Sequence, residues 1–265
     1  MRIQYYIPAK LRGLVQMIWE QQSETPTRWQ ILPSGKVELI FNIGPKMEDI
    51  DGKRIGGDFN PTERFCFLSG LHTKPLYMSF SRFHVMGIQM QPIAVKAFFG
   101  IPCIEVRDWA IWGEYILNEI NKIEDQLRGK GSFMQKAKCL EKFLFSKVNE
   151  NSELYIAFKL NDIVNKFSGS TEVIKIGDLT GYSRTHTHRL FTEWLGLSAT
   201  HCLRLQQFLR ALEQIHYTPE KLTDIAFQNG YYDQAHFIRH FREFANMTPG
   251  AYKRQKTDLI GQLSA

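Results

Sequence analysis

The feature that most constrains this chain is an internal repeat near its C-terminus. The segment 189–199, RLFTEWLGLSA, recurs at an offset of 50 residues as the segment 239–249, RHFREFANMTP. Within it, Gly196 pairs with Asn246 and Ser198 pairs with Thr248. Glycine and asparagine both tolerate the left-handed backbone conformation that ends a helix, and serine and threonine both cap a following helix. The repeat therefore predicts two copies of one helical unit.

Upstream of each segment lie the parts of a helix-turn-helix unit. Each copy has a small residue, a turn glycine and a capping residue, which are Gly177, Gly181 and Ser183 in one copy and Ala226, Gly230 and Asp233 in the other. The small residue lets two helices cross closely, the glycine makes the tight turn, and the cap begins the second helix. The sequence thus predicts two helix-turn-helix units.

The chain as a whole is long enough for two domains, because a domain typically has roughly 100–200 residues. We predict an α+β protein with a strand-rich domain and trailing helices over 1–150, and an all-α domain of about seven helices over 151–265. The expected strands cover 37–43, 65–68 and 76–91 with a break near 81–82, and the expected helices cover 93–99, 113–128 and 132–149. No strand is expected after residue 154, and the expected linker is 149–152.

The composition excludes few classes of protein. A formal net charge of +6 suits nucleic acid or an anionic membrane as a partner. No run of ~18 apolar residues predicts a membrane span, and the first residues lack a signal-peptide pattern, so we expect a cytoplasmic protein. Wide spacing of the cysteines favours reduced thiols over a disulfide framework or a zinc site; they are Cys66, Cys103, Cys139 and Cys202.

Catalytic and metal-binding patterns are missing from the sequence. A metal-binding cupin needs clustered ligands, whereas His72 and His84 stand alone, and His186 and His188 point apart if they lie on a helix. No phosphate-binding glycine loop and no nucleophile elbow occur. We expect no enzymatic activity, no metal and no cofactor.

The second helix of each unit is expected to enter the major groove of DNA. Its exposed face is predicted to carry Thr185, His188 and Arg189 in the first unit, and Ala235, His236, Arg239 and Arg242 in the second. The opposite face of the second helix is an apolar stripe of Phe237, Phe241 and Phe244. Arginine grips guanine, histidine contacts base edges, and alanine or threonine contacts a thymine methyl group.

A structural role is the alternative for the two arginines of the repeat. Each would then pair with the glutamate four residues further on, Glu193 or Glu243. We expect His186 and His240 to be packing or surface residues. For the histidines of the two exposed faces, base contact and packing both stay open.

Residues 154–254 resemble the DNA-binding domain of AraC/XylS-type transcriptional regulators. The stretches that carry the resemblance are 224–242, DIAFQNGYYDQAHFIRHFR, and 247–253, MTPGAYK. The resemblance implies a long helix, from about Ser198 to His216, that separates the two units. It also implies recognition helices in consecutive major-groove segments of one DNA face, ~34 Å apart.

The expected site residues follow from the same resemblance. The family's base-reading positions fall on Thr185, His188, Arg189, Ala235, His236 and Arg239, and its phosphate contacts fall on Ser183, Arg184, Thr223 and Arg242. Gln234, which opens the second recognition helix, completes the expected DNA-binding set. The first unit departs from the family pattern, since Thr187 stands where an apolar anchor is usual. We therefore expect it to pack less tightly or to read DNA less specifically.

The first 110 residues are similar to the strand-rich sensor domain of one branch of such regulators. The similar segments are 31–44, ILPSGKVELIFNIG, and 85–92, VMGIQMQP, continuing to 99–102. This similarity implies a small barrel-like β fold for effector sensing or dimerisation. Its aromatic residues either line a ligand pocket or only fill a core; they are Trp19, Trp29, Phe41, Phe65, Phe67, Tyr77 and Phe80.

The sequence thus predicts a sequence-specific transcriptional regulator that binds double-stranded promoter DNA and responds to an effector or partner at its N-terminal domain. Further candidate partners are RNA polymerase, a small-molecule effector of unknown identity and a second copy of the chain, with no membrane expected. Two alternatives stay open. One is a protein-interaction module with a degenerate first unit, and the other is a small-molecule sensor with a fused DNA-binding domain.

Overall fold

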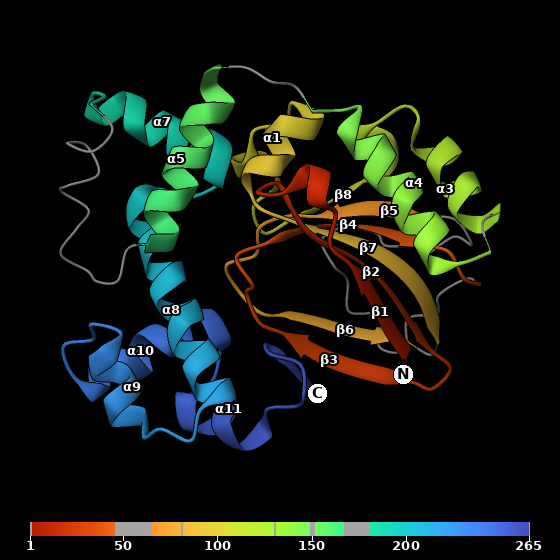
Figure 1. Cartoon of the computed structure of the whole chain (residues 1–265). Coiled ribbons are helices and arrows are strands. Elements are labelled where there is room, and N and C mark those ends of the chain that lie inside the picture. The colour runs from red at the N-terminus through yellow and green to blue at the C-terminus, as the bar shows by residue number, and fades with distance from the viewer. Residues whose placement is uncertain are drawn as a thin grey trace.

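The computed structural model describes residues 2–45, 65–80, 82–129, 131–148, 152–166 and 181–264. Strands and four helices form one part of the molecule, and a group of helices strung along a long central helix forms the other (Figure 1). The expected strand-rich and helical parts are therefore both present. The expected linker falls almost entirely on residues outside the described ranges.

A six-stranded antiparallel sheet is the framework of the strand-rich part. In spatial order its strands are β1 (Arg2–Tyr6), β2 (Val15–Ser23), β7 (Phe83–Met90), β4 (Val37–Asn42), β5 (Cys66–Ser69) and β8 (Ala110–Trp112). Trp19 lies opposite Gly87 in this register. A Cβ at Gly87 would lie 2.2 Å from the Trp19 ring, so only glycine admits the indole against this strand.

A smaller sheet contains the end of the chain. Its strands, in order, are β6 (Leu76–Phe80), β3 (Thr27–Ile31) and β9 (Gln262–Ser264). The expectation of no strand after residue 154 is therefore wrong. A three-residue strand is too short to show a period in the sequence, and β9 forms because β3 offers it an edge. Within the described ranges both sheets are open, and neither closes into a barrel.

Helices cover one face of the large sheet. They are α1 (Ile93–Phe99), α2 (Gly113–Ile116), α3 (Ile120–Gly129) and α4 (Phe133–Phe145), with short 3-10 turns η1 (Ala9–Leu11) and η2 (Cys103–Val106). The single helix expected over 113–128 is two helices, because Leu117 adopts an extended backbone conformation between them. A capping box of Ser132 and Gln135 begins α4.

Two apolar clusters lie on the two faces of the large sheet. Side chains alternate along a strand, so Ile18, Leu39 and Ile88 face the helices and join the main core. The second cluster lies on the other face and contains Phe65, Phe67, Phe80, Phe83 and Val85, with Trp19 and Trp29 packed against it. Of the aromatic residues considered for a pocket, Phe41 belongs to the main core and Tyr77 is exposed.

The helical part follows the internal repeat. Its helices are α5 (Ser152–Lys166), α7 (Arg184–Leu195), α8 (Ala199–Tyr217), α9 (Leu222–Gln228), α10 (Gln234–Ala245) and α11 (Pro249–Gln255). The long helix expected from about Ser198 to His216 is confirmed as α8, with α7 and α10 toward its two ends (Figure 1). Gly177 and the expected first helix of the first unit lie outside the described residues.

The equivalences in the repeat are confirmed by backbone and capping geometry. Gly196 ends α7 at φ 74° and Asn246 ends α10 at φ 53°, both left-handed. The Ser198 hydroxyl accepts a hydrogen bond from the backbone N–H of His201, and the Thr248 hydroxyl accepts one from Ala251. The shared backbone preference of glycine and asparagine, and the shared capping ability of serine and threonine, are therefore both used in each copy of the repeat.

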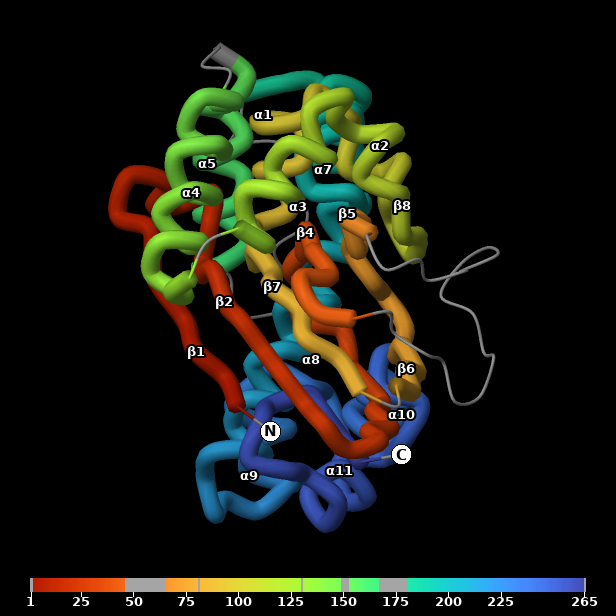
Figure 2. Tube along the Cα trace, turned by 90° about the vertical axis from the view of Figure 1, so that its right-hand side faces the viewer, coloured from red at the N-terminus to blue at the C-terminus, as the bar shows by residue number. Residues whose placement is uncertain are grey.

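The strand-rich part contacts both units of the helical part. Helix α7 packs against α1 and η2, and a Cβ at Gly196 would lie 2.9 Å from the Cys103 sulfur. Near the second unit, the Gln30 side-chain amide donates a hydrogen bond of 3.1 Å to the Ala245 carbonyl at the end of α10. A view turned by 90° shows α7 at the height of β4 and β5, with α9 and α11 below the strands (Figure 2).

We expect Leu263→Ala to lower the free energy of unfolding by about 2–5 kcal/mol, because truncating a buried leucine removes apolar contacts and leaves a cavity. Leu263 is only 2% exposed and belongs to the main core. Urea denaturation followed by tryptophan fluorescence measures the change. Ile260→Ala is the matched control, since Ile260 is 39% exposed; equal losses for the two variants would contradict a packed role for β9.

Candidate nucleic-acid interface

Helix α7 has one buried face and one exposed face. Ser183 caps its start by accepting a hydrogen bond of 3.3 Å from the backbone N–H of His186. Leu190, Phe191 and Trp194 are buried against the rest of the protein. The opposite side is exposed and carries Arg184, Thr185, His188 and Arg189. The first unit therefore presents the residues that the sequence placed on its exposed face.

Helix α10 repeats this arrangement. Asp233 caps it by accepting a hydrogen bond of 2.6 Å from the backbone N–H of His236. The expected apolar stripe of Phe237, Phe241 and Phe244 is buried. Gln234, Ala235, Arg239 and Arg242 are exposed, and His236 is half-buried. Both second helices therefore present exposed arginines to an anionic partner, with one glutamate, Glu193 or Glu243, four residues after the repeat arginine of each helix.

Two histidines have packing roles, as expected. His240 is 1% exposed, and its Nδ1 lies 2.9 Å from the Tyr231 hydroxyl. Its Nε2 is buried without a hydrogen-bond partner in the described structure, and burial lowers its pKa to about 4. His186 is half-buried, with its ring 4.6 Å from the ring of Tyr182.

Thr223 lies in the first turn of α9, and the cap of that helix is Lys221. Thr223 is exposed, and its hydroxyl lies 3.3 Å from the Asp224 carboxylate. Thr187 is buried at the place in the repeat that Phe237 fills in the second unit. The first unit therefore has a smaller side chain in this part of its core.

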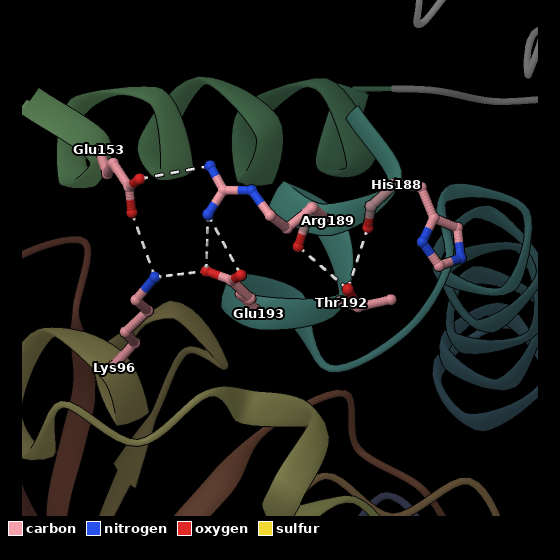
Figure 3. Close-up of polar contacts among 6 residues, drawn as sticks. All are labelled: Lys96, Glu153, His188, Arg189, Thr192 and Glu193. Carbon is pink, nitrogen blue, oxygen red and sulfur yellow. Dashed lines mark hydrogen bonds and ion pairs between the residues drawn. The ribbon is translucent and has the colours of Figure 1, made fainter. Parts of the chain in front are cut away.

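The two arginines of the repeat have different surroundings. Arg189 lies 3.2 Å from Glu193 and 3.5 Å from Glu153 of α5 (Figure 3). Lys96 of α1 lies 2.6 Å from Glu193 and 3.1 Å from Glu153, and it completes a ring of four charges. The expected structural alternative, pairing with the glutamate four residues on, is thus present for Arg189.

Arg239 forms no ion pair with any residue that the structure describes. The glutamate equivalent to Glu193 is Glu243, and it pairs instead with Arg204 of α8. The guanidinium of Arg239 is therefore available to a partner in a way that the guanidinium of Arg189 is not.

Sequence analysis missed Lys96 and Glu153. They lie outside the repeat, 97 and 40 residues before Glu193, and Lys96 is the single charged residue of the short apolar helix α1. Nothing in the local pattern of either helix indicates that their charges meet on α7. Only the packing of α7 against α1 and α5 brings them together.

The helical part is similar in sequence to domains of known proteins. A family described as "Helix-turn-helix domain" matches residues 176–255, and a "Domain of unknown function (DUF6597)" matches residues 4–112. An uncharacterized HTH-type transcriptional regulator of Staphylococcus aureus is 34% identical over 87 residues. The C-terminal part of this chain is an AraC-type helix-turn-helix domain.

The AraC-type domain is the part that the relatives share with this chain. The match covers 33% of this chain and 12% of the S. aureus protein, and a match to YbfP of Bacillus subtilis is 32% identical and covers 29% and 26% of the two chains. The chain therefore spans a small fraction of the length of these relatives. Among solved structures, ToxT of Vibrio cholerae has a TM-score of 0.46 and 12% identity, with 89% of this chain and 98% of that chain covered.

A metal site, a reactive thiol and a membrane-spanning helix each place requirements on the described residues. No three histidine, cysteine, aspartate or glutamate side chains gather there as a metal site. All four thiols are free, as expected, and burial raises the pKa of Cys103 to about 12. Across the same residues, every helix is too short or too polar for a membrane crossing.

We expect the protein to lose stability as the pH falls from about 6.5 to about 4, because the unfolded chain then binds a proton that native His240 excludes. The loss attributable to His240 amounts to at most about 3 kcal/mol and levels off below pH 4. Unfolding free energies measured across this range for the wild type and His240→Gln give the difference. The exposed His188→Gln is the control, and a wild-type slope retained by His240→Gln would contradict the assignment.

Proposed function

We propose that this protein is a sequence-specific regulator of transcription that binds promoter DNA through α7 and α10. The observation that carries the proposal is the exposure of an arginine-bearing face on each of the two helices while the opposite faces are buried. Each face offers arginine as a donor for guanine or phosphate, with a small side chain beside it, Thr185 in α7 and Ala235 in α10. The AraC-type match and the names of the relatives support the same function.

The residues have distinct roles in this proposal. Base edges are contacted by Thr185, His188, Arg189, Ala235, His236 and Arg239. Phosphates are contacted by Ser183, Arg184, Thr223, Gln234 and Arg242. Phosphate contacts fix the position of the protein on the duplex, and base contacts select the sequence.

The strand-rich part is proposed to modulate DNA binding. It packs against α7 and also pairs with the last strand of the chain, so a change in it acts on the helical part directly. The aromatic cluster between the two sheets, with half-buried Trp19 and Trp29 at its edge, is the proposed place for an apolar effector. No catalytic step is proposed, and binding to chromosomal DNA implies a cytoplasmic protein.

Selection of bound fragments from random double-stranded DNA tests the function. We expect one enriched sequence with two half-sites about one helical turn apart, and an affinity that falls steeply with salt. Absence of enrichment at low salt, with the protein folded, would reject DNA binding and leave a protein-interaction module as the remaining candidate.

Arg239→Ala is expected to weaken binding to the selected site by about 1–3 kcal/mol and to relax base preference at one position, because a bidentate contact to a base is lost. Fluorescence anisotropy with the selected site and its single-base variants measures both effects. Arg12→Ala, an exposed arginine of the strand-rich part, is the control for loss of one positive charge. An unchanged base preference in Arg239→Ala would remove Arg239 from the reading residues.

A further inference from the structure

The ring of Lys96, Glu153, Arg189 and Glu193 joins three elements that are distant in sequence. Lys96 comes from α1 in the strand-rich part, Glu153 from α5, and the other two from the recognition helix α7. Figure 3 shows the four side chains meeting where these helices approach one another, with His188 on the far side of α7. One of the four is a proposed base-reading residue, and the other three belong to no DNA contact proposed above.

We infer that Glu153 and Glu193 form an ionic latch that holds Arg189 away from DNA, and that Lys96, which pairs with the same two carboxylates, weakens this hold and makes the first helix-turn-helix unit responsive to the position of the strand-rich part. The inference rests on the proposed function, since it assumes that the exposed face of α7 meets DNA. It adds a means of regulation and two residues, Lys96 and Glu153, that act on DNA binding without touching DNA.

The terminal nitrogens of Arg189 that contact the glutamates are also the donors that would bind DNA. Its Nη1 lies 3.2 and 3.3 Å from the two Glu193 oxygens, and its Nη2 lies 3.5 Å from Glu153. A guanine or a phosphate is bound through the same guanidinium donors. The two carboxylates also repel phosphate. Bidentate binding of DNA through both terminal nitrogens therefore requires Arg189 to leave at least one glutamate.

The ion pairs of Arg189 with the two glutamates are weak enough to break when DNA binds. The Arg189 side chain is 44% exposed and that of Glu153 is 37% exposed. Ion pairs at such exposure contribute little net stability, because water screens the charges and the side chains lose conformational freedom. The latch therefore opens at small cost when DNA offers better partners, and small changes in its charges alter affinity measurably.

Lys96 connects the latch to the strand-rich part. Its ammonium neutralises both carboxylates at 2.6 and 3.1 Å, and it lies 4.8 Å from the centre of the buried Trp194 ring. Lys96 thus competes with Arg189 for the same two glutamates. A movement of α1 away from α7 would withdraw Lys96, strengthen the hold on Arg189 and weaken binding of DNA by the first unit.

The second unit lacks this arrangement. Glu243, the repeat equivalent of Glu193, pairs with Arg204 of α8, which belongs to the helical part itself. Arg239 has no carboxylate partner among the described residues. The latch therefore affects only the half-site that the first unit binds. The half-site that the second unit binds serves as an internal control in affinity measurements.

A double-mutant cycle tests the latch. On the selected DNA site we expect Glu153→Gln to lower the Kd about two- to fivefold, because Arg189 is released. Lys96→Met is expected to raise the Kd by a similar factor, because two carboxylates then hold Arg189 alone. In the Arg189→Ala background the gain from Glu153→Gln should vanish.

Asp162→Asn is the matched control, since it makes the same change of charge in an exposed ion pair of α5. Base substitutions in each half-site show which unit responds, and only the half-site of the first unit should gain selectivity in Glu153→Gln. Melting temperatures verify that every variant is folded. If the wild type binds no DNA, the proposed function fails and the latch fails with it.

If the wild type binds, three results would overturn the latch alone. The first is an unchanged Kd in Glu153→Gln. The second is a gain equal to that of Asp162→Asn, which would indicate general electrostatics. The third is a gain retained in the Arg189→Ala background, which would show that Glu153 acts through another group.

Discussion

The packing of α7 sets the arrangement of the whole molecule. Its buried face packs against α1 and η2 of the strand-rich part and against α5 of the helical part, while its other face is exposed to solvent. A buried tryptophan and phenylalanine on one helix supply much of the apolar area that holds such an interface together. Because a single rigid helix carries both faces, whatever shifts the buried side also shifts the exposed side.

The helical part was largely predictable, since its information is local. Capping residues, turn glycines and the aromatic stripe act within a few residues, and the repeat shows each of them twice. The left-handed backbone at Gly196 and Asn246 is the clearest case, because the two residue types share one backbone preference. The exposed residues of α7 and α10 follow from the same helical period.

Features that depend on contacts across the chain were not predictable. The break at Leu117 interrupts a continuous apolar stripe, and the strand near Leu263 has too few residues for any period. The ring around Arg189 joins residues from three helices, so no single window of sequence contains it. The sequence offered Glu193 as a partner for Arg189 and Glu243 for Arg239, but only tertiary packing gave Glu243 a different partner.

The path of the chain determines whether the two parts can be produced as separate fragments. It leaves the strand-rich part, forms the helices α5 to α11, and returns to add β9 to the edge of β3. The two parts are therefore not separable by one cut. A fragment ending before α5 would carry β3 with a bare edge, and an unpaired edge strand recruits strands from other molecules. A tag or partner fused directly after β9 would lie beside that same edge.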